Sequence, residues 1–363
     1  MTQKQRTAIV LFNLGGPDSP AAIAPFLKNF FMDPLILRVP YPARFFLSRL
    51  IAFRRSRKEA GQSYAALGGS SPLLANSRAQ ADALQATLNA DNSDTEYRSF
   101  VCMRYWHPLS PEIAAQVKAW NPDRVVLLPL YPQYSTTTTE SSFRAWDEAC
   151  RKISYAPPTA RICCYPEDKG FITESANRVR AAYVESSARN TVAPRILFSA
   201  HGLPEKIVQD GDPYQWQCEQ GAKAIVKAAG LESADWAICY QSRVGPLKWI
   251  GPSTDEELRR AGKDGVPVVI YPHAFVNEHV ETLVEIEEEY RELAHEAGVP
   301  DFVRVETVGT GIDFIGGLAA LVRGLAGKTG TFSNTGVAIC PHSFSACRFA
   351  ADNKHTTHRS AAA

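Results

Sequence analysis

A continuous apolar run at residues 124–130, RVVLLPL, gives the clearest indication of the fold. A run without alternating polar residues is typical of a strand buried on both faces, as in a parallel sheet covered by helices. Further short apolar runs lie at 7–13, 97–103, 160–164, 196–199, 235–241 and 266–271, and segments with helical periodicity separate most of them. This alternation predicts a parallel α/β fold with right-handed crossovers.

Length and composition limit the class of protein. The 363 residues suggest about two domains, and 39 basic against 38 acidic residues give a net charge of +1. That charge provides no field to gather nucleic acid or coat a membrane. No apolar run reaches the ~18 residues of a membrane-spanning helix, and no signal-peptide pattern is present. The eight cysteines are too few for a disulfide scaffold, so we expect a cytoplasmic protein.

Two pairs of strand ends resemble each other within the chain. AIVLFNLGGP from residue 8 resembles RILFSAHGLP from residue 195, and RVVLLPLYPQYS from residue 124 resembles PVVIYPHAFVNEH from residue 267. The offsets between the pairs are unequal, which argues against a solenoid. Two interpretations explain this internal similarity: two similar doubly wound halves, or chance similarity between parallel strands.

His201 is the first candidate for chemistry. It follows the predicted strand RILFSA, and ligands of open α/β sheets bind at the carboxyl ends of strands. Imidazole titrates near neutral pH, so it can take or release protons. A structural histidine satisfied by hydrogen bonds would give the same sequence pattern.

The acidic segment 277–293, NEHVETLVEIEEEYREL, is the second candidate, and it also follows a predicted strand. It holds seven glutamates between 278 and 292 against one arginine. Glu281, Glu285 and Glu289 are four residues apart, so they would stack along one side of a helix. Like charges at this spacing repel each other, and a cation along that side would offset the repulsion. A solvated acidic face is the alternative interpretation.

Two other segments have two interpretations each. The four threonines at 136–139 follow a predicted strand, where hydroxyls bind an anionic group or cap the next helix. The segment 41–53, YPARFFLSRLIAF, mixes aromatic and aliphatic residues with two arginines. It is too short to span a bilayer, but it could lie at the membrane interface or form the lip of a cleft. An ordinary core-facing helix would have a similar pattern.

Together these segments resemble the ferrochelatase family, enzymes that insert Fe2+ into protoporphyrin IX in the last step of haem biosynthesis. The resemblance runs from about residue 7 to residue 325. It rests on LFNLGGPDS, GGSSPL, MRYWHP, LYPQYS, FSAHGLP, GDPY, YQSRVGPLKWIGPSTDE and AFVNEHVETLVEIEEEY, in this order. It implies the chelatase-like fold: two Rossmann-like domains, each with a four-stranded parallel sheet flanked by helices, and an active cleft between them.

With this fold we expect a first domain at residues 1–155, with a helix at about 312–326 packing back on it. The second domain would cover residues 156–311, and a partly disordered, cysteine-containing tail would cover 327–363. The implied partners are protoporphyrin IX and Fe2+, without nucleic acid. We also expect a peripheral contact with the inner face of the membrane through 41–53, and a monomer or homodimer.

The resemblance implies roles for particular residues. His201 would be the active-site histidine and Glu281 its acidic partner across the cleft, and both would be catalytic and contact the metal. Glu285 and Glu289 would continue an acidic metal rail, on a helix that the family distorts into π-type turns. The residues expected to contact the macrocycle, line its pocket or hold its propionates are Tyr64, Ser71, Arg104, Tyr105, Trp249, Phe275 and His279.

Cysteines are the main departure from the family. Many ferrochelatases carry a [2Fe–2S] cluster on a C-terminal extension, and an all-thiolate cluster needs four cysteines. Here the tail has Cys340 and Cys347 but no third cysteine nearby. Cys163 and Cys164 could complete the set only if the fold brings them to the tail. We therefore expect no cofactor to be required besides the iron substrate.

Three alternative functions remain: a coproporphyrin ferrochelatase, a cobalt chelatase of the cobalamin route, and a non-catalytic tetrapyrrole-binding protein. Fe2+ and Co2+ are neighbours in the affinity series, so ligand type barely separates them. The LYPQYS and VGPLKWIGP segments favour iron. A carrier would need the cleft but not the row of glutamates, so that row favours catalysis.

Overall fold

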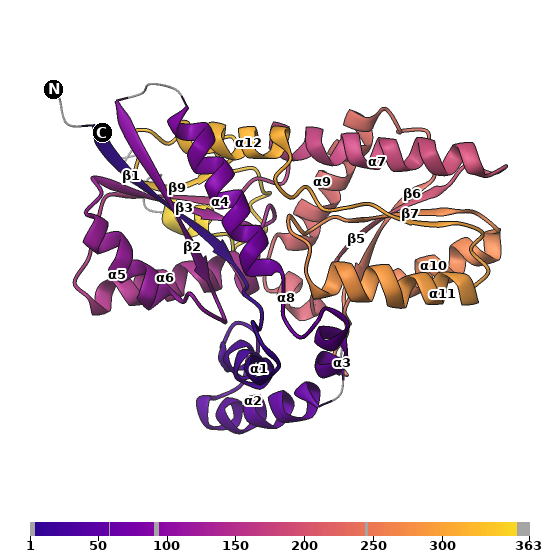
Figure 1. Ribbon diagram of the computed structural model, residues 1–363, viewed down its shortest axis with the longest axis horizontal. Coiled ribbons are helices and arrows are strands. Elements are labelled where there is room, and N and C mark those ends of the chain that lie inside the picture. Colours follow the sequence, from indigo (N-terminus) through magenta and orange to yellow (C-terminus); the bar gives the residue numbers. More distant parts are fainter. Residues whose placement is uncertain (1–3, 58, 91–93, 244–245, 354–363) are drawn as a thin grey trace. The chain divides into compact units, whose positions relative to one another are not determined.

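The computed structural model describes residues 4–57, 59–90, 94–243 and 246–353. Its internal contacts define two units. Unit 1 comprises Met1–Cys164, Leu318–Ala338 and Arg348–Ala363, and unit 2 comprises Tyr165–Gly317 and Ile339–Cys347. Each unit contains one parallel sheet with helices on both faces (Figure 1). The predicted α/β class is therefore confirmed.

The sheet of unit 1 has β3, the strand that RVVLLPL predicted, at its centre, and β1 lies next to it. Its order is β2 (Thr95–Met103), β1 (Gln5–Asn13), β3 (Arg124–Pro129), β4 (Thr159–Cys164) and β9 (Gly330–Ser333), all parallel. All six residues of β3 are buried, as a two-faced apolar run requires. The remaining elements are η1 (Pro20–Ala22), α1 (Ile23–Met32), α2 (Tyr41–Ser56), α3 (Glu59–Ala66), α4 (Leu73–Asn89), α5 (Ser110–Trp120), the π-helix η2 (Thr136–Glu140), α6 (Ser141–Lys152) and α13 (Arg348–Asn353).

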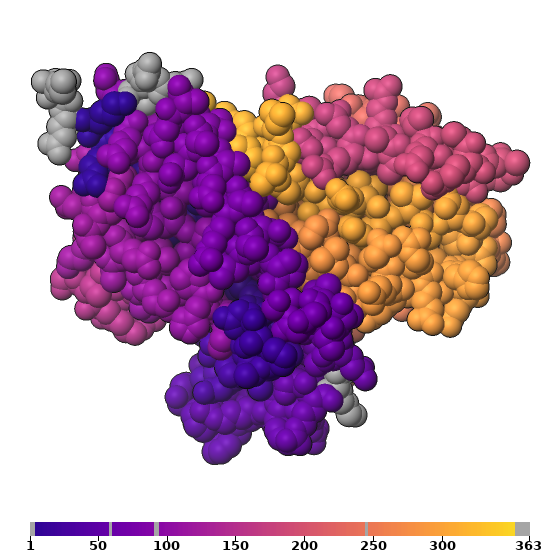
Figure 2. Space-filling view, viewed as in Figure 1, coloured from indigo at the N-terminus to yellow at the C-terminus, as the bar shows by residue number. Residues whose placement is uncertain are grey.

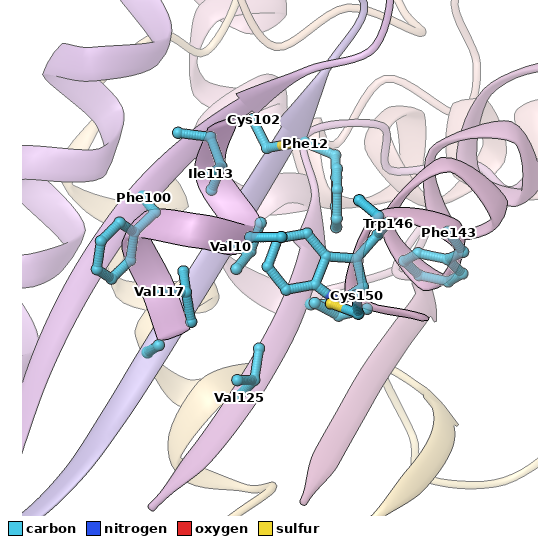
Figure 3. Packing of buried hydrophobic residues seen from close by; sticks show 14 of the residues in the cluster. Val10, Phe12, Phe100, Cys102, Ile113, Val117, Val125, Phe143, Trp146 and Cys150 are labelled. Atoms are coloured by element: carbon cyan, nitrogen blue, oxygen red, sulfur yellow. The ribbon is translucent and has the colours of Figure 1, made fainter. Parts of the chain in front are cut away.

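Alternating residues of β1 face two different helical layers. Ala8, Val10 and Phe12 pack against α5 and α6 in one continuous core (Figure 3). In that core Phe12 meets Phe143 and Trp146 edge-on, with ring centroids 5.9 and 6.1 Å apart. The opposite face of the sheet is covered by α4, which contacts β1 and β2. This burial fixes the direction of β1 and therefore the place of the loop that follows it.

The sheet of unit 2 has four parallel strands, as expected. Its order is β6 (Trp236–Gln241), β5 (Arg195–His201), β7 (Val268–Pro272) and β8 (Phe302–Arg304). The helices are α7 (Lys169–Arg189), α8 (Glu205–Gln209), α9 (Tyr214–Ala229), α10 (Thr254–Asp264), the π-helix η3 (Glu281–Glu289) and α11 (Tyr290–Glu296). Helices α7 and α9 lie on one face of the sheet, and α10 and α11 lie on the other (Figure 1). The helix α12 (Ile312–Arg323) contains the boundary between the units.

Both sheets repeat one topology. The first four strands of unit 1 have the order β2-β1-β3-β4, and those of unit 2 have the equivalent order β6-β5-β7-β8. The internal sequence similarity relates β1 to β5 and β3 to β7, so it agrees with two doubly wound halves. In each half the second strand lies on one side of the first strand and the third strand lies on its other side, and ligands bind in the crevice at such a switch point. In unit 2 this point lies between the carboxyl ends of β5 and β7.

Two details differ from the sequence-based expectation. The sheet of unit 1 has five strands rather than four, because Gly330–Ser333 of the tail pairs with β4. The strand β4 pairs with β3 and belongs to unit 1, whereas a boundary after residue 155 assigned it to the second domain. The tail also contains α13, and its last ten residues, 354–363, lie outside the described residues.

Candidate active site

His201 and Glu281 meet at the switch point of unit 2. His201 is the last residue of β5, and Glu281 is the first residue of η3, which follows β7 in the chain. The His201 Nδ1 and Glu281 Oε2 atoms are 2.9 Å apart. Their side chains are 39% and 26% exposed, so a ligand can reach both. The structure thus brings the predicted histidine and its predicted acidic partner into direct contact.

His279 and Phe275 lie beside this pair, in the loop between β7 and η3. The rings of Phe275 and His279 are 4.6 Å apart, and His279 Nε2 is 4.0 Å from Glu281 Oε2. Burial lowers the pKa of His279 from its usual value, and it outweighs the opposing effect of Glu281 and Glu278. His279 is therefore neutral at physiological pH and adds no positive charge to the site.

Glu285 is held by neutral hydrogen-bond donors. Ser242 donates from its backbone N–H at 2.9 Å and from its hydroxyl at 2.6 Å. The Tyr290 hydroxyl donates at 3.1 Å, and the Gln241 amide donates at 3.3 Å. Burial, together with the charge of Glu281, raises the pKa of this carboxyl. The repulsion predicted between glutamates four residues apart therefore acts between Glu281 and Glu285.

Other glutamates of the segment have structural partners. Arg304 bonds to Glu278 and Glu287, and Arg291 also bonds to Glu287. Burial alone would raise the pKa of Glu278, but the Thr282 hydroxyl and the charge of Arg304 lower it below its usual value. Glu288, Glu289 and Glu292 are exposed. The segment therefore combines both interpretations: Glu281 and Glu285 face the site, whereas other glutamates form ion pairs or face solvent.

The π-type helix implied by the resemblance is present. Residues Glu281–Glu289 form a π-helix, in which hydrogen bonds join residues five apart, as in the bond from Tyr290 N–H to the Glu285 carbonyl. Thr136–Glu140 form a second π-turn, which the sequence did not predict. The Ser135 hydroxyl accepts a bond from the Thr137 N–H, so it caps that turn. Capping is thus one observed use of the hydroxyls after β3.

Trp249 lies beside Gly202, the residue that follows His201. A Cβ on Gly202 would lie 2.8 Å from the Gln241 carbonyl oxygen and 3.2 Å from Trp249 Cε3, so only glycine fits there without a shift of the backbone. A β-bridge between Pro204 and Trp249 holds the two segments together. Val244 and Gly245 of the same motif lie outside the described residues. In unit 2 the predicted residues therefore follow the carboxyl ends of neighbouring strands: His201 ends β5, Trp249 follows β6, and Phe275, His279 and Glu281 follow β7.

The remaining predicted residues lie in unit 1. Tyr64 and Ser71 are close to Gly16, after β1: a Cβ on Gly16 would lie 2.5 Å from the Ser71 side chain and 4.0 Å from Tyr64 Oη. Ser71 is partly exposed, whereas Tyr64 is buried. These residues lie near the carboxyl end of β1, which is the equivalent place to His201 at the end of β5 in the repeated topology.

Arg104 and Tyr105 are tied to a buried carboxylate that sequence reasoning missed. Asp33 accepts hydrogen bonds from Arg104 at 2.8 Å, from the Tyr105 hydroxyl at 2.9 Å, and from Ser141. Arg104 also donates to the Ser141 hydroxyl at 2.6 Å. The side chain of Tyr105 is fully buried, and that of Arg104 is 22% exposed. Here Tyr105 braces Arg104 through Asp33, and Arg104 retains an exposed part.

The cysteines fall into two groups. The Cys163 and Cys164 sulfur atoms are 3.4 Å apart at the end of β4, in unit 1. Cys340 and Cys347 belong to unit 2, where the Gln217 amide donates to Cys340 Sγ at 3.1 Å. Neither unit alone supplies these four thiolates. Across the described ranges, no three His, Cys, Asp or Glu side chains gather as a metal-binding group. The chemistry proposed below requires no cluster.

Sequence reasoning also missed the partners of Glu285. Gln241 and Ser242 stand at the end of β6, as His201 stands at the end of β5, and this position was the available signal. The ring of Tyr290 packs in the core of unit 2, and its hydroxyl also donates to Glu285. Fold and site together define an α/β enzyme whose switch point presents an imidazole–carboxylate pair next to the partly buried carboxyl of Glu285.

Comparison with known proteins identifies the family. A family model described as ferrochelatase matches residues 6–325. Ferrochelatase of Caulobacter vibrioides is 50% identical over 349 residues, which cover 96% of this chain and 98% of that protein. Ferrochelatase of Hyphomonas neptunium is 48% identical over 348 residues, which cover 94% of both chains. The chain belongs to the ferrochelatase family, which are metal chelatases of the lyase class.

A solved structure, SirB from Bacillus subtilis with Fe3+, aligns over 89% of this chain and 96% of its own. The identity is 12% and the TM-score is 0.49, so this likeness carries no argument.

Proposed function

We propose that the enzyme inserts Fe2+ into protoporphyrin IX, forming protohaem and releasing two protons. The observation that carries this proposal is the 2.9 Å contact between His201 Nδ1 and Glu281 Oε2 at the switch point of unit 2. Metallation needs a group that takes pyrrole protons next to a group that attracts a cation. An imidazole–carboxylate pair supplies both.

The macrocycle itself presents the main barrier. A flat porphyrin keeps two protons inside its ring and directs no lone pair out of the plane. Trp249 and Phe275, both partly buried near His201 and His279, offer apolar surface for the ring. Binding energy from such contacts can hold the ring distorted, so that a pyrrole nitrogen becomes accessible.

His201 accepts the pyrrole proton in this proposal. Imidazole titrates close to neutral pH, which suits a general base. The Glu281 carboxylate against Nδ1 orients the ring and stabilises the imidazolium that forms. His279 stays neutral beside the pair, so it does not repel the incoming Fe2+.

Iron approaches along the acidic residues Glu289, Glu285 and Glu281. Glu289 is exposed at the surface, and Glu281 is in contact with His201. A small number of ligands suits this task, because a complete cage would retain the metal instead of transferring it. No resident cofactor takes part in these steps.

Anaerobic incubation of the protein with protoporphyrin IX and Fe2+ tests the function, with porphyrin fluorescence as the readout. We expect the fluorescence to decay at a rate proportional to the enzyme concentration. Faster decay with coproporphyrin III would indicate the coproporphyrin alternative, and decay with Co2+ but not Fe2+ would indicate a cobalt chelatase. Binding without metallation would indicate a carrier.

We also propose that the enzyme works in the cytoplasm and touches an anionic membrane surface through α2. This helix exposes Phe46 at 70%, Phe53 at 53% and Leu50 at 45%. Its sequence, YPARFFLSRLIAFRRS, contains four arginines and no acidic residue. Figure 2 shows the α1–α2 segment at the surface of unit 1. Within the described part of the chain, no helix has the length and apolarity needed to cross a bilayer.

A further inference from the structure

The carboxylate of Glu285 is saturated with hydrogen bonds. Oε1 accepts from the Ser242 N–H and the Tyr290 hydroxyl, and Oε2 accepts from the Ser242 hydroxyl and the Gln241 amide. A carboxylate has about four lone-pair sites, so these four donors occupy all of them. A metal ion can bind Glu285 only if at least one donor withdraws.

Three of the four donors are fixed by their surroundings. The Ser242 N–H belongs to the backbone. Tyr290 is buried in the core of unit 2, which holds its ring in place. Gln241 is 1% exposed, and its Oε1 accepts a hydrogen bond from the Ser199 hydroxyl at 2.8 Å. That bond turns the amide nitrogen of Gln241 toward Glu285, so the amide cannot rotate without losing a buried partner.

The Ser242 hydroxyl is the remaining donor, and one rotation about χ1 withdraws it. Ser242 has a φ of +59°, in the left-handed region that residues other than glycine rarely adopt. This conformation lets one residue direct both its N–H and its hydroxyl at the same carboxylate. Such unfavourable backbone conformations persist where the surrounding structure enforces them, and they concentrate at functional sites.

We propose that the Ser242 hydroxyl competes with the metal for Glu285 and so weakens the hold of this carboxylate on iron. The inference rests on the proposed role of Glu285 as a metal ligand. When iron leaves Glu285, the Ser242 hydroxyl re-forms its hydrogen bond with the carboxylate. Without the hydroxyl, the departure of iron would leave that lone-pair site without a donor, which costs more free energy. Ser242 is thus a positioning residue that adjusts the release of iron toward His201 and Glu281.

The test is the binding of Co2+ alone to the porphyrin-free protein, measured by anaerobic calorimetry at pH 8. We expect Ser242→Ala to bind Co2+ about tenfold more tightly than the parent, because a hydrogen bond to a charged group is worth roughly that much. In metallation assays the same variant should lower the KM for Fe2+ and also lower kcat. Weaker or unchanged Co2+ binding, or no measurable binding by either protein, would overturn the inference.

Two further variants separate this effect from damage to the fold. Ser242→Gly also removes the hydroxyl but relieves the left-handed strain, so it should tighten Co2+ binding without loss of stability. Ser253→Ala removes the hydroxyl that caps α10 in the same unit, and it should lower stability while leaving Co2+ binding unchanged.

Glu285→Gln separates the role of Ser242 from the proposed role of Glu285 as a metal ligand. If this variant binds Co2+ as the parent does, Glu285 is not a metal ligand. Both the proposed iron route along Glu289, Glu285 and Glu281 and the inference about Ser242 would then be wrong. If it weakens binding while Ser242→Ala does not tighten it, only the role of Ser242 is wrong. Absence of metallation by the parent enzyme would instead contradict the proposed function.

Discussion

Two side chains at the switch point are expected to carry most of the chemistry. Glu281→Ala and His201→Ala should each reduce metallation by about 100-fold or more, the usual contribution of a positioned acid or base. Because the pair acts as one unit, the double variant should lose little more than either single variant. Initial rates of protoporphyrin metallation under anaerobic conditions measure these losses.

The matched control is Glu288→Ala, which removes an exposed carboxylate from the same π-helix. It should leave the rate unchanged. Near-normal turnover by Glu281→Ala would show that the 2.9 Å contact with His201 serves the structure rather than the reaction.

Another histidine, His273, should make unit 2 sensitive to acid. It is fully buried, its Nε2 donates to the Cys218 carbonyl at 2.8 Å, and burial lowers its pKa to about 4. The unfolded chain takes up this proton below about pH 6.5, whereas the folded chain does not until about pH 4. Stability is therefore lost as the pH falls through this window, by up to about 1.4 kcal/mol per pH unit.

Hydrogen exchange of the β5 and β7 amides at pH 7 and pH 5 measures this loss, after correction for the intrinsic exchange rates. His273→Gln keeps a donor for the Cys218 carbonyl but does not titrate. The opening free energy should fall by about 2 kcal/mol more in the parent than in this variant. An equal fall in both proteins would show that other groups cause the acid sensitivity.

The helix α2 offers a test of membrane docking. Replacing Phe46, Leu50 and Phe53 together with serine should reduce flotation with anionic liposomes several-fold, because these exposed side chains would enter the interface. Phe45 is a poorer target, since it is only half-exposed and the Arg49 guanidinium lies 3.3 Å from its ring centroid. Raising the salt concentration should weaken binding further.

Val184→Ser is the control for this experiment. Val184 is 57% exposed on α7, in the other unit, and its replacement should not affect flotation. Unchanged flotation of the triple variant would contradict membrane docking through α2.

Sequence patterns predicted some elements well because local signals mark their ends. The helices α5 and α9 fill two of the stretches between predicted strands where helical periodicity was expected. Asn121 and Gly230 end them in the left-handed conformation. The strand β8 has only three residues, too few for a pattern, and it was missed. β9 was missed because its pairing with β4 depends on residues far apart in the chain.

The site was predictable to the extent that its residues follow strands: His201 ends β5, and Glu281 begins the helix that follows β7. His201 and Glu281 could be found in this way, and so could their proximity once the family was recognised. The hydrogen bonds around Glu285 could not, because they join Ser242 of one loop to a helix more than 40 residues later. The tie between Asp33 and Arg104 likewise depends on a contact across 71 residues.

The tail cysteines decide whether the whole protein carries an iron–sulfur cluster. We expect anaerobically purified protein to contain no acid-labile sulfide, and Cys340→Ser and Cys347→Ser to keep metallation activity. The reason is that the tail supplies only two of the four thiolates that a cluster needs. Sulfide and iron analysis after removal of bound porphyrin measures this directly.

Thermal unfolding of the two serine variants separates a loss of stability from a loss of activity, since Cys347 is buried. A coloured preparation with about two sulfides per chain, bleached by Cys347→Ser, would contradict the expectation.

The fifth strand of unit 1 also protects the chain from self-association. Without β9, the N–H and C=O groups of β4 that now pair with it would be open along the side of the sheet. Such an uncovered strand is a template for pairing with a neighbouring molecule. β9 has only four residues and offers a much shorter template. Proteolytic loss of the tail would therefore favour precipitation, even with His201 and Glu281 in place.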